Sequence, residues 1–490
     1  MNIRFVVLLL LFVVALPANG TAARKNDSDE VIRYSEEEVH AELTYLYETL
    51  QAVSYDLYRT MSKSEFDEAF NALHRSITAP MTALEINRQF QSFVVLAGLS
   101  HCQVEYPSDA YRQWYQGGGK FFPFDIAFSD NRPIIVANWS ENEDIMAGDE
   151  ILAVDGVAVS AILRGLYPLI SGENVYAKRT MLEGGEFANT WWYAHGNFDS
   201  GRFHWRDGNG KEHEALVSGY TLDDYRRKQP HIKLPQFVRK DREFRFIDDV
   251  AYLRPGIFLN LESSDISKHE AFENGEFLHF LDSAFAEIED KRPGSLIIDI
   301  RGNNGGDNSF SDPMIAYFAD RPFRIASKFS VRTSEITKSF WKDVDIESLE
   351  KLKNQILSLP NGTRFEAELE EISPRNDEFA YRGPVYVLVD RFSFSNAAVV
   401  AAIVQDYGFG TLIGEETSYV PSSCSSIHTF SLPRTEQTVV YAKACSIRPN
   451  GDTTMRGVIP DIYVSDHLLT DADEILEKAL EISREHMRSN

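Results

Sequence analysis

Hydrophobic residues recur every three or four positions through the first part of the chain, which is the spacing of an α-helix. Ser35 and Glu38 stand at the start of this pattern and have the spacing of a helix capping box. Three helices are predicted, beginning near Ser35, Ser62 and Thr82. Gly98 ends the third helix, and a short strand is predicted after it. These elements make up an N-terminal helical unit at residues 24–116.

The pattern changes to strand-like alternation after the stretch GGGKFFP at 117–123. Strands are predicted at 124–129 and 133–139, and a further strand leads into the turn Asp155-Gly156. The run from 145 to 156 resembles the core motif of a PDZ-type peptide-binding module, although a plain β-hairpin fits the same residues. We therefore expect a PDZ-like, β-rich domain at 117–225, followed by a basic, proline-containing linker up to residue 240.

Strands and helices alternate from residue 243 onwards, which is typical of an α/β layered domain. Two strands, at 295–300 and 385–389, are apolar throughout and suit a sheet that is covered on both faces. Helices are predicted at 276–290, 396–406 and 471–488, and an acidic helical insertion is predicted at 343–358. The sequence thus predicts an α/β domain at 226–490.

The first residues have a basic start, the apolar core FVVLLLLFVV and a small-residue exit. These are the features of a secretory signal peptide, which we place at residues 1–23. The apolar run from Phe5 to Pro17 is shorter than the roughly 20 residues that a spanning helix needs. We expect export to the periplasm or the extracellular space, without an integral membrane span.

Composition narrows the range of partners. The chain has 490 residues, of which 43% are hydrophobic, so it can bury the cores of two or three domains. Its formal net charge of -25 disfavours nucleic acid or an anionic membrane as a partner. Three cysteines are too few for a disulfide framework or a zinc cluster, although Cys424 and Cys445 flank a predicted hairpin and can pair there. No metal-binding motif is present, and we expect no metal or cofactor.

The first candidate catalytic residues are two serines on a turn. Ser393 and Ser395 lie between the strand at 385–389 and the helix that follows. A helix N-terminus offers free backbone N–H groups to a developing oxyanion, so a hydroxyl there can act as a nucleophile. Taken alone, the more common role of such a serine is to cap the helix.

Two other segments carry suitable groups. The stretch SLIIDIRGNNGGDN at 295–308 is a strand that opens into a Gly-rich loop, in which N–H groups can converge on one point. It is not a phosphate loop, since no Gly-Lys-Ser/Thr follows. His101, preceded by Ser100, lies after the third helix and is a candidate general base. A lone histidine is more often a hydrogen-bonded structural residue.

Together these segments resemble a known family. SLIIDIRGNNGGDN, then VYVLVDRFSFSNAAVVAAIVQDYGFGTLIGEET, then RGVIPDIYV are similar to the motifs of the C-terminal processing (tail-specific) and tricorn-like serine peptidases. The resemblance implies a ClpP/crotonase-like peptidase domain with Ser395 as its nucleophile. The processing branch uses a lysine 25 residues later, where this chain has Val420. The tricorn-like branch uses a histidine preceded by a serine, which Ser100-His101 matches.

The resemblance also implies the remaining roles. His101 takes the proton of Ser395 and returns it to the leaving amine. The oxyanion hole is expected from the N–H groups of Asn396 and of Gly305 or Gly306. A carboxylate should support Ser100, and the candidates for it are as follows: Glu416, Glu415 and Asp452.

The sequence therefore predicts an exported serine peptidase that cuts peptides or unfolded protein tails through an acyl-enzyme on Ser395. The alternative is a catalytically inactive protein of the same fold that binds a peptide or an apolar ligand. Cys102 is a poor candidate nucleophile, because adjacent side chains on a strand point to opposite faces and would not meet at His101.

Overall fold

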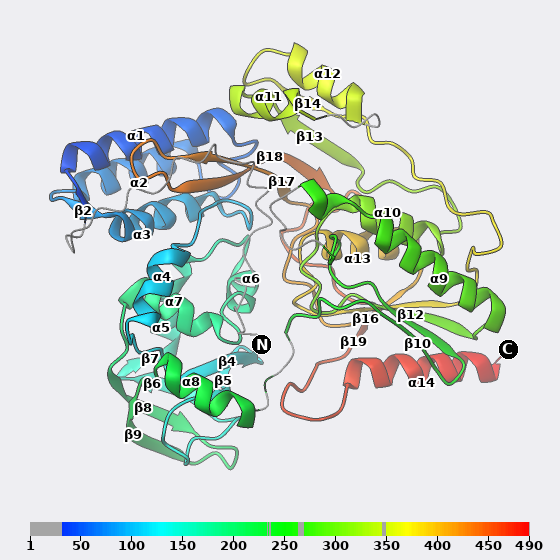
Figure 1. Cartoon of the computed structure of the whole chain (residues 1–490), viewed down its shortest axis with the longest axis horizontal. Coiled ribbons are helices and arrows are strands. Elements are labelled where there is room, and N and C mark those ends of the chain that lie inside the picture. Colours follow the sequence, from blue (N-terminus) through cyan, green and yellow to red (C-terminus); the bar gives the residue numbers. More distant parts are fainter. Residues whose placement is uncertain (1–31, 233, 235–236, 263–268, 345–348, 490) are drawn as a thin grey trace.

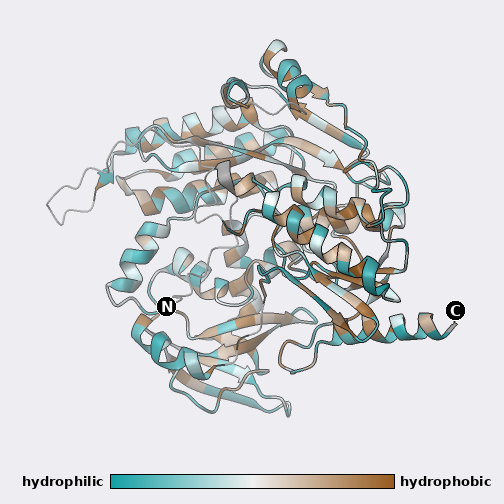
Figure 2. Cartoon of the chain, turned by 45° about the vertical axis from the view of Figure 1, so that its right-hand side comes forward, coloured by the Kyte–Doolittle hydropathy of each residue, from teal (hydrophilic) through white to brown (hydrophobic). Residues whose placement is uncertain are grey.

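The computed structural model describes residues 32–232, 234, 237–262, 269–344 and 349–489, and the predicted signal peptide lies outside this part of the chain. Figure 1 shows the N-terminal helices beside a hairpin, a β-rich unit below them, and a layered α/β part that extends to the C-terminus. No helix in the described ranges is both long and apolar enough to cross a membrane. Figure 2 shows helices that carry both hydrophilic and hydrophobic residues, as expected of helices that pack on one side only.

The N-terminal helices form where the sequence predicts them. They are α1 (Glu36–Val53), α2 (Lys63–Ser76) and α3 (Ala83–Val94). Each begins with a complete capping box, which satisfies backbone N–H groups of its first turn. Their apolar faces share one core with residues of a distant hairpin, among them Cys424, Val439 and Tyr441. The helical unit is thus packed on the C-terminal part of the chain.

The β-rich unit is an antiparallel sheet in the order β4-β5-β6-β8-β9, with β7 paired to β6. Its strands are β4 (Phe124–Ser129), β5 (Arg132–Asn138), β6 (Glu150–Val154), β7 (Val157–Ala158), β8 (Ser200–Arg206) and β9 (Glu212–Ser218). Asp155 and Gly156, between β6 and β7, both have positive φ. Positive φ at both central residues gives the tight turn that the Asp-Gly pair predicts.

Several short helices are additions that the sequence pattern did not reveal. They are α4 (Ser108–Gln116), α5 (Val159–Leu166), α6 (Val175–Thr180) and α7 (Glu186–His195). Part of the stretch expected to be a linker is also helical, because α8 (Leu222–Lys228) begins with a capping box at Thr221. A 3-10 turn at Gln229–His231 continues this helix. The stretch expected to be a linker from residue 225 therefore begins within a helix, which the sequence did not predict.

The α/β part is built on a six-stranded sheet in the order β10-β11-β12-β15-β16-β19. All neighbouring pairs are parallel except β10 with β11. The strands are β10 (Glu243–Ile247), β11 (Val250–Arg254), β12 (Ser295–Asp299), β15 (Val385–Val389), β16 (Thr411–Gly414) and β19 (Ile462–Tyr463). β12 and β15 are buried along their whole length, as their apolar sequences predict.

Helices cover both faces of this sheet. One face packs against α9 (Gly275–Lys291), α10 (Asn308–Ala316) and α13 (Asn396–Tyr407) in the largest core of the chain. The other face packs against α14 (Glu474–Ser489), through Ile475 and Ala479. The predicted α/β layering is therefore present. Of the acidic insertion expected at 343–358, residues 345–348 lie outside the described ranges and α12 (Glu350–Ser358) forms its end.

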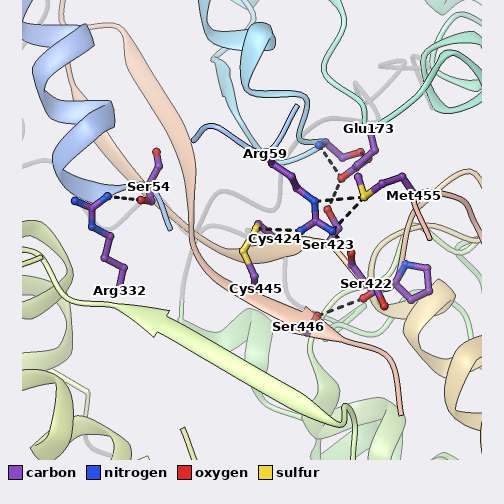
Figure 3. The surroundings of a disulfide bond; sticks show 12 residues. Ser54, Arg59, Glu173, Arg332, Ser422, Ser423, Cys424, Cys445, Ser446 and Met455 are labelled. Atoms are coloured by element: carbon purple, nitrogen blue, oxygen red, sulfur yellow. Dashed lines mark hydrogen bonds between the residues drawn. A yellow bond between two sulfur atoms is a disulfide. The ribbon is translucent and has the colours of Figure 1, made fainter. Parts of the chain in front are cut away.

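A second sheet connects the parts. Its order is β14-β13-β18-β17, and the short strand β3 (Gln103–Val104) also pairs with β18. The other strands are β13 (Lys328–Arg332), β14 (Arg364–Glu366), β17 (Cys424–Ser431) and β18 (Thr438–Ile447). Cys424 and Cys445 lie opposite each other in this hairpin and form a disulfide, shown in Figure 3. The pairing of β3 with β18 brings the end of the helical unit to the α/β part.

Candidate active site

Ser395 lies on a strained turn between β15 and α13. Its φ is 50° and its ψ is -121°, a conformation that residues other than glycine rarely adopt. Its side chain makes no capping hydrogen bond to the helix that it precedes. The geometry therefore differs from that of Ser35, which caps α1 at a φ of -62°. The hydroxyl of Ser395 remains available for other partners.

The Gly-rich loop packs closely against this turn. A Cβ atom on Gly305 would lie 2.6 Å from the Asn396 nitrogen and 2.9 Å from the Ser395 Cβ atom. Gly305 also has a φ of 92°. Both observations require glycine here, because any side chain would push the serine turn away.

Ser393, the other serine of the turn, has a structural role. It is fully buried, and its Oγ atom donates to the Ile300 carbonyl (2.9 Å) and accepts from the Asp390 N–H (3.1 Å). Asp390 in turn accepts from the Gly302 N–H at 3.0 Å. Burial raises the pKa of Asp390 to about 6. These bonds fasten the serine turn to the Gly-rich loop and leave Ser395 as the candidate nucleophile.

His101 lies next to Ser395 although the two residues are 294 positions apart in the sequence. Its Nε2 atom is 3.4 Å from the Ser395 Oγ atom. The ring is held by aromatic contacts with Phe394 and Tyr419, at centroid distances of 5.9 and 5.5 Å. Burial lowers the pKa of His101, while the nearby carboxylate of Glu173 acts in the opposite direction. The imidazole is thus neutral near pH 7 and can accept the serine proton.

A carboxylate from the β-rich unit supports Ser100. Glu173, in the loop before α6, accepts from the Ser100 N–H at 3.0 Å and also from the Ser100 hydroxyl. Ser423 donates its hydroxyl to the same carboxylate at 2.7 Å, and Figure 3 shows Glu173 and Ser423 side by side. Glu173 therefore joins the loop of His101 to the hairpin β17-β18.

The three carboxylates named from the sequence lie elsewhere. Glu416 accepts from Arg456 Nε and from the Gly457 N–H, both at 3.1 Å. Asp452 accepts from the Thr454 N–H at 2.9 Å. Glu415 is buried in an ion pair with Arg391. Within the described ranges, no hydrogen bond joins any of them to Ser100 or His101. The sequence offered no signal for Glu173, because its contact with Ser100 spans 73 residues and it belongs to no motif.

Arg391 links the serine turn to the β-rich unit. Its guanidinium pairs with Glu183, through two contacts of 2.8 Å, and with Glu415. All three side chains are buried, so each charge is balanced inside the protein rather than by water. Glu183 and Glu173 come from the same segment, which thus binds Arg391 of the serine turn and Ser100 next to His101.

The candidate oxyanion donors differ in whether their backbone N–H groups are already hydrogen-bonded. The Gly305 N–H donates to Asn303 Oδ1 at 2.7 Å and is therefore engaged. No hydrogen bond within the described part of the chain uses the N–H of Gly306 or of Asn396. Asn396 begins α13, where the helix dipole favours negative charge. Gly306 and Asn396 fit the role of oxyanion donors better than Gly305 does.

Two alternatives to a serine nucleophile are a metal site and the thiol of Cys102. No group of three His, Cys, Asp or Glu side chains there could hold a metal ion. Cys102 is unpaired but buried, and burial raises the pKa of its thiol to about 12. A thiol with this pKa is protonated at neutral pH and is a poor nucleophile.

Comparisons with known proteins concern the family and the fold of this chain. Residues 270–464 match the sequence model of peptidase family S41. Among solved structures, mature CPAF is 16% identical over 87% of this chain and 92% of its own, with a TM-score of 0.60. Mature CPAF complexed with lactacystin is also 16% identical, over 92% of this chain and 97% of its own, with a TM-score of 0.62. The likeness to CPAF concerns the fold. Ser395 lies inside the matched range, whereas His101 and Glu173 lie outside it.

Proposed function

Because residues 270–464 place this chain in peptidase family S41, we propose that it is an exported serine peptidase that hydrolyses peptides or unfolded protein tails. The observation that carries the proposal is the pair formed by Ser395 and His101. The hydroxyl projects from a strained turn, and it lies 3.4 Å from a partly buried imidazole nitrogen. A nucleophile and a base at this separation are suitable for acyl transfer.

In the proposed reaction, Ser395 Oγ attacks the carbonyl carbon of the scissile peptide bond while His101 Nε2 takes its proton. The oxygen of the tetrahedral intermediate accepts from the N–H groups of Asn396 and Gly306. Such donors contribute about 3–4 kcal/mol each to the transition state. His101 then protonates the leaving amine. Water, deprotonated by the same imidazole, hydrolyses the acyl-enzyme and restores Ser395.

Glu173 is proposed as a positioning residue. It contacts Ser100 rather than the imidazole, and it is also held by Ser423. By fixing Ser100, it fixes the backbone of the next residue, His101. Its negative charge also stabilises the imidazolium that forms during the reaction.

The substrate class rests on the family and on the arrangement of the parts. We propose that residues 117–225 are a PDZ-like module and that residues 226–490 are the peptidase domain. The antiparallel sheet and the Asp155-Gly156 turn support the first assignment. Export is proposed from the signal-peptide features of residues 1–23.

The test uses the purified protein without residues 1–23, incubated with an unstructured substrate such as casein and labelled separately with a fluorescent fluorophosphonate. Wild type should cleave and be labelled, whereas Ser395→Ala should do neither. Ser393→Ala is the matched control, and it should be labelled if it is folded. Cleavage that persists in Ser395→Ala would rule out this nucleophile. A folded wild type with neither activity nor label would support the binding alternative.

A further inference from the structure

A small cavity lies beside the active site, between the helical unit and the β-rich unit. Its volume is about 60 Å³. Polar side chains face it from α3, β3 and α7, and apolar side chains complete its wall. The residues that matter below are Gln103, Leu169, Ser171, Met181, Glu186 and Asn189.

The cavity is built from the same two chain segments as the active site. Ser100 and Glu173 hold each other at the active site, and Gln103 and Ser171 line the cavity two or three residues away. Ser171 Oγ donates to the Cys102 carbonyl at 2.8 Å, which ties the two segments together. The segments that hold Ser100 and Glu173 therefore continue directly into the wall of the cavity.

Met181 forms a shared wall. It lines the cavity, and it also packs against the cluster of Phe394, Ala398 and Tyr419. Phe394 and Tyr419 are the rings that hold His101. One side of Met181 thus faces the cavity and the other faces the surroundings of the catalytic histidine.

Glu186 in this cavity has an unused acceptor. Its Oε2 atom accepts from Asn189 Nδ2 at 3.1 Å, but its Oε1 atom is shielded from solvent and has no hydrogen-bond partner. No ion pair involves Glu186 within the described ranges. Buried polar atoms are nearly always paired, because leaving one unpaired is costly. Burial raises the pKa of Glu186 to about 7, as expected for a carboxyl without a cation beside it.

We propose that this cavity is a substrate subsite that takes a lysine side chain, with Glu186 as the specificity-determining residue. The proposal rests on the peptidase function proposed above. A lysine ammonium would supply the missing donor to Glu186 Oε1 and the missing positive charge.

The volume favours lysine over larger cations. A water-sized group needs roughly 10–15 Å³ of such volume, so 60 Å³ holds about four to six of them. The lysine side chain is an unbranched row of four methylenes and one nitrogen. Leu169 and neighbouring apolar residues line the path of the methylenes. The planar guanidinium of arginine is larger and branched.

The experiment measures kcat/KM for matched peptides in which one lysine, placed in turn at each position around the scissile bond, is replaced by uncharged norleucine. Wild type should favour lysine at one position by about 10- to 100-fold, the range expected of a charge-assisted hydrogen bond. Glu186→Gln should bring this ratio close to one, chiefly by slowing cleavage of the lysine peptide. Glu186→Asp should retain part of the preference.

The outcomes separate the subsite from the proposed function. If wild type cleaves both peptides of every pair equally, the subsite is wrong and the peptidase proposal stands. If Glu186→Gln slows both peptides alike with the ratio unchanged, Glu186 is only structural and the proposal is overturned. If Glu186→Gln does not fold, the wild-type ratio alone decides. If no peptide is cleaved and Ser395 takes no label, the proposed function itself fails.

Discussion

The strained turn at Ser395 leads to a prediction about stability that is independent of any substrate. Replacing Ser395 by glycine should make the protein more stable than wild type, although it removes the proposed nucleophile. The reason is the φ of 50° combined with a ψ of -121°, which glycine adopts without strain and serine does not.

The magnitude follows from three contributions. A residue other than glycine in such a conformation costs about 1–3 kcal/mol. This stabilisation is reduced by about 0.5–1 kcal/mol, because glycine has more conformational freedom than serine in the unfolded chain. The long contact between Ser395 and His101, at 3.4 Å, is lost in both the glycine and the alanine variant and is worth at most about 0.5 kcal/mol. The net gain for Ser395→Gly is about 1 kcal/mol, whereas Ser395→Ala keeps the strain.

Differential scanning calorimetry checks the prediction. A gain of 1 kcal/mol raises the Tm by about 2–4 °C for a domain of 150–250 residues. Ser395→Gly should therefore melt above both wild type and Ser395→Ala, and both variants should be inactive. Ser35 is the matched control, because it begins a helix at an ordinary φ of -62° with its side chain as the cap. Ser35→Gly should melt no higher than wild type.

The reasoning would be refuted if Ser395→Gly melted at or below wild type while its fold was intact. That result would mean that the positive φ is not imposed on the serine by its surroundings. It would also remove the argument that the Gly-rich loop holds the hydroxyl in a reactive position.

Further predictions concern the base, the disulfide and a buried lysine. Glu173→Gln should lower kcat by about 10- to 100-fold with little change in KM, because a charged hydrogen bond behind the base is weakened. When kcat/KM is plotted against pH, the midpoint of its fall on the acid side should lie below pH 6.5. The reason is that burial lowers the pKa of His101, which must be neutral to act as the base. Replacing Cys424 and Cys445 by alanine should cost up to about 3 kcal/mol of stability, measured as a lower Tm without reductant. Lys443→Met should stabilise the protein most below about pH 7 and progressively less toward pH 10.5, as Tm values at pH 6 and 9 would show. The folded-state pKa of Lys443 is lowered to about 7, so in this window the unfolded chain binds a proton that the folded protein has lost.

The elements that could be predicted from the sequence carry local signals. The capping box at Ser35 and the apolar run at 385–389 depend on neighbours only a few residues away, and both are present in the structure. The same applies to the Gly-rich loop before α10. The short helices α6 and α7 carry weaker local patterns, and their packing against β4 depends on the rest of the unit.

The site was predicted less completely than the fold. Resemblance to a family pointed to Ser395 and His101, and the structure brings them together. Nothing local distinguished Glu173, because a carboxylate in a loop gains its role only from the residue that folding places opposite it. The candidates Glu416, Glu415 and Asp452 all follow Ser395 in the sequence, whereas Glu173, which contacts Ser100, precedes it.

The pairing of β3 with β18 has a consequence for the timing of activity. His101 is made early, but its strand finds a partner only when Val439 and Val440 of β18 exist. Ser395 is made between them. A growing chain therefore lacks the strand pairing that places His101 opposite Ser395 until about nine-tenths of it has been synthesised. The order of the residues along the chain thus delays assembly of the proposed active site until the chain is nearly complete.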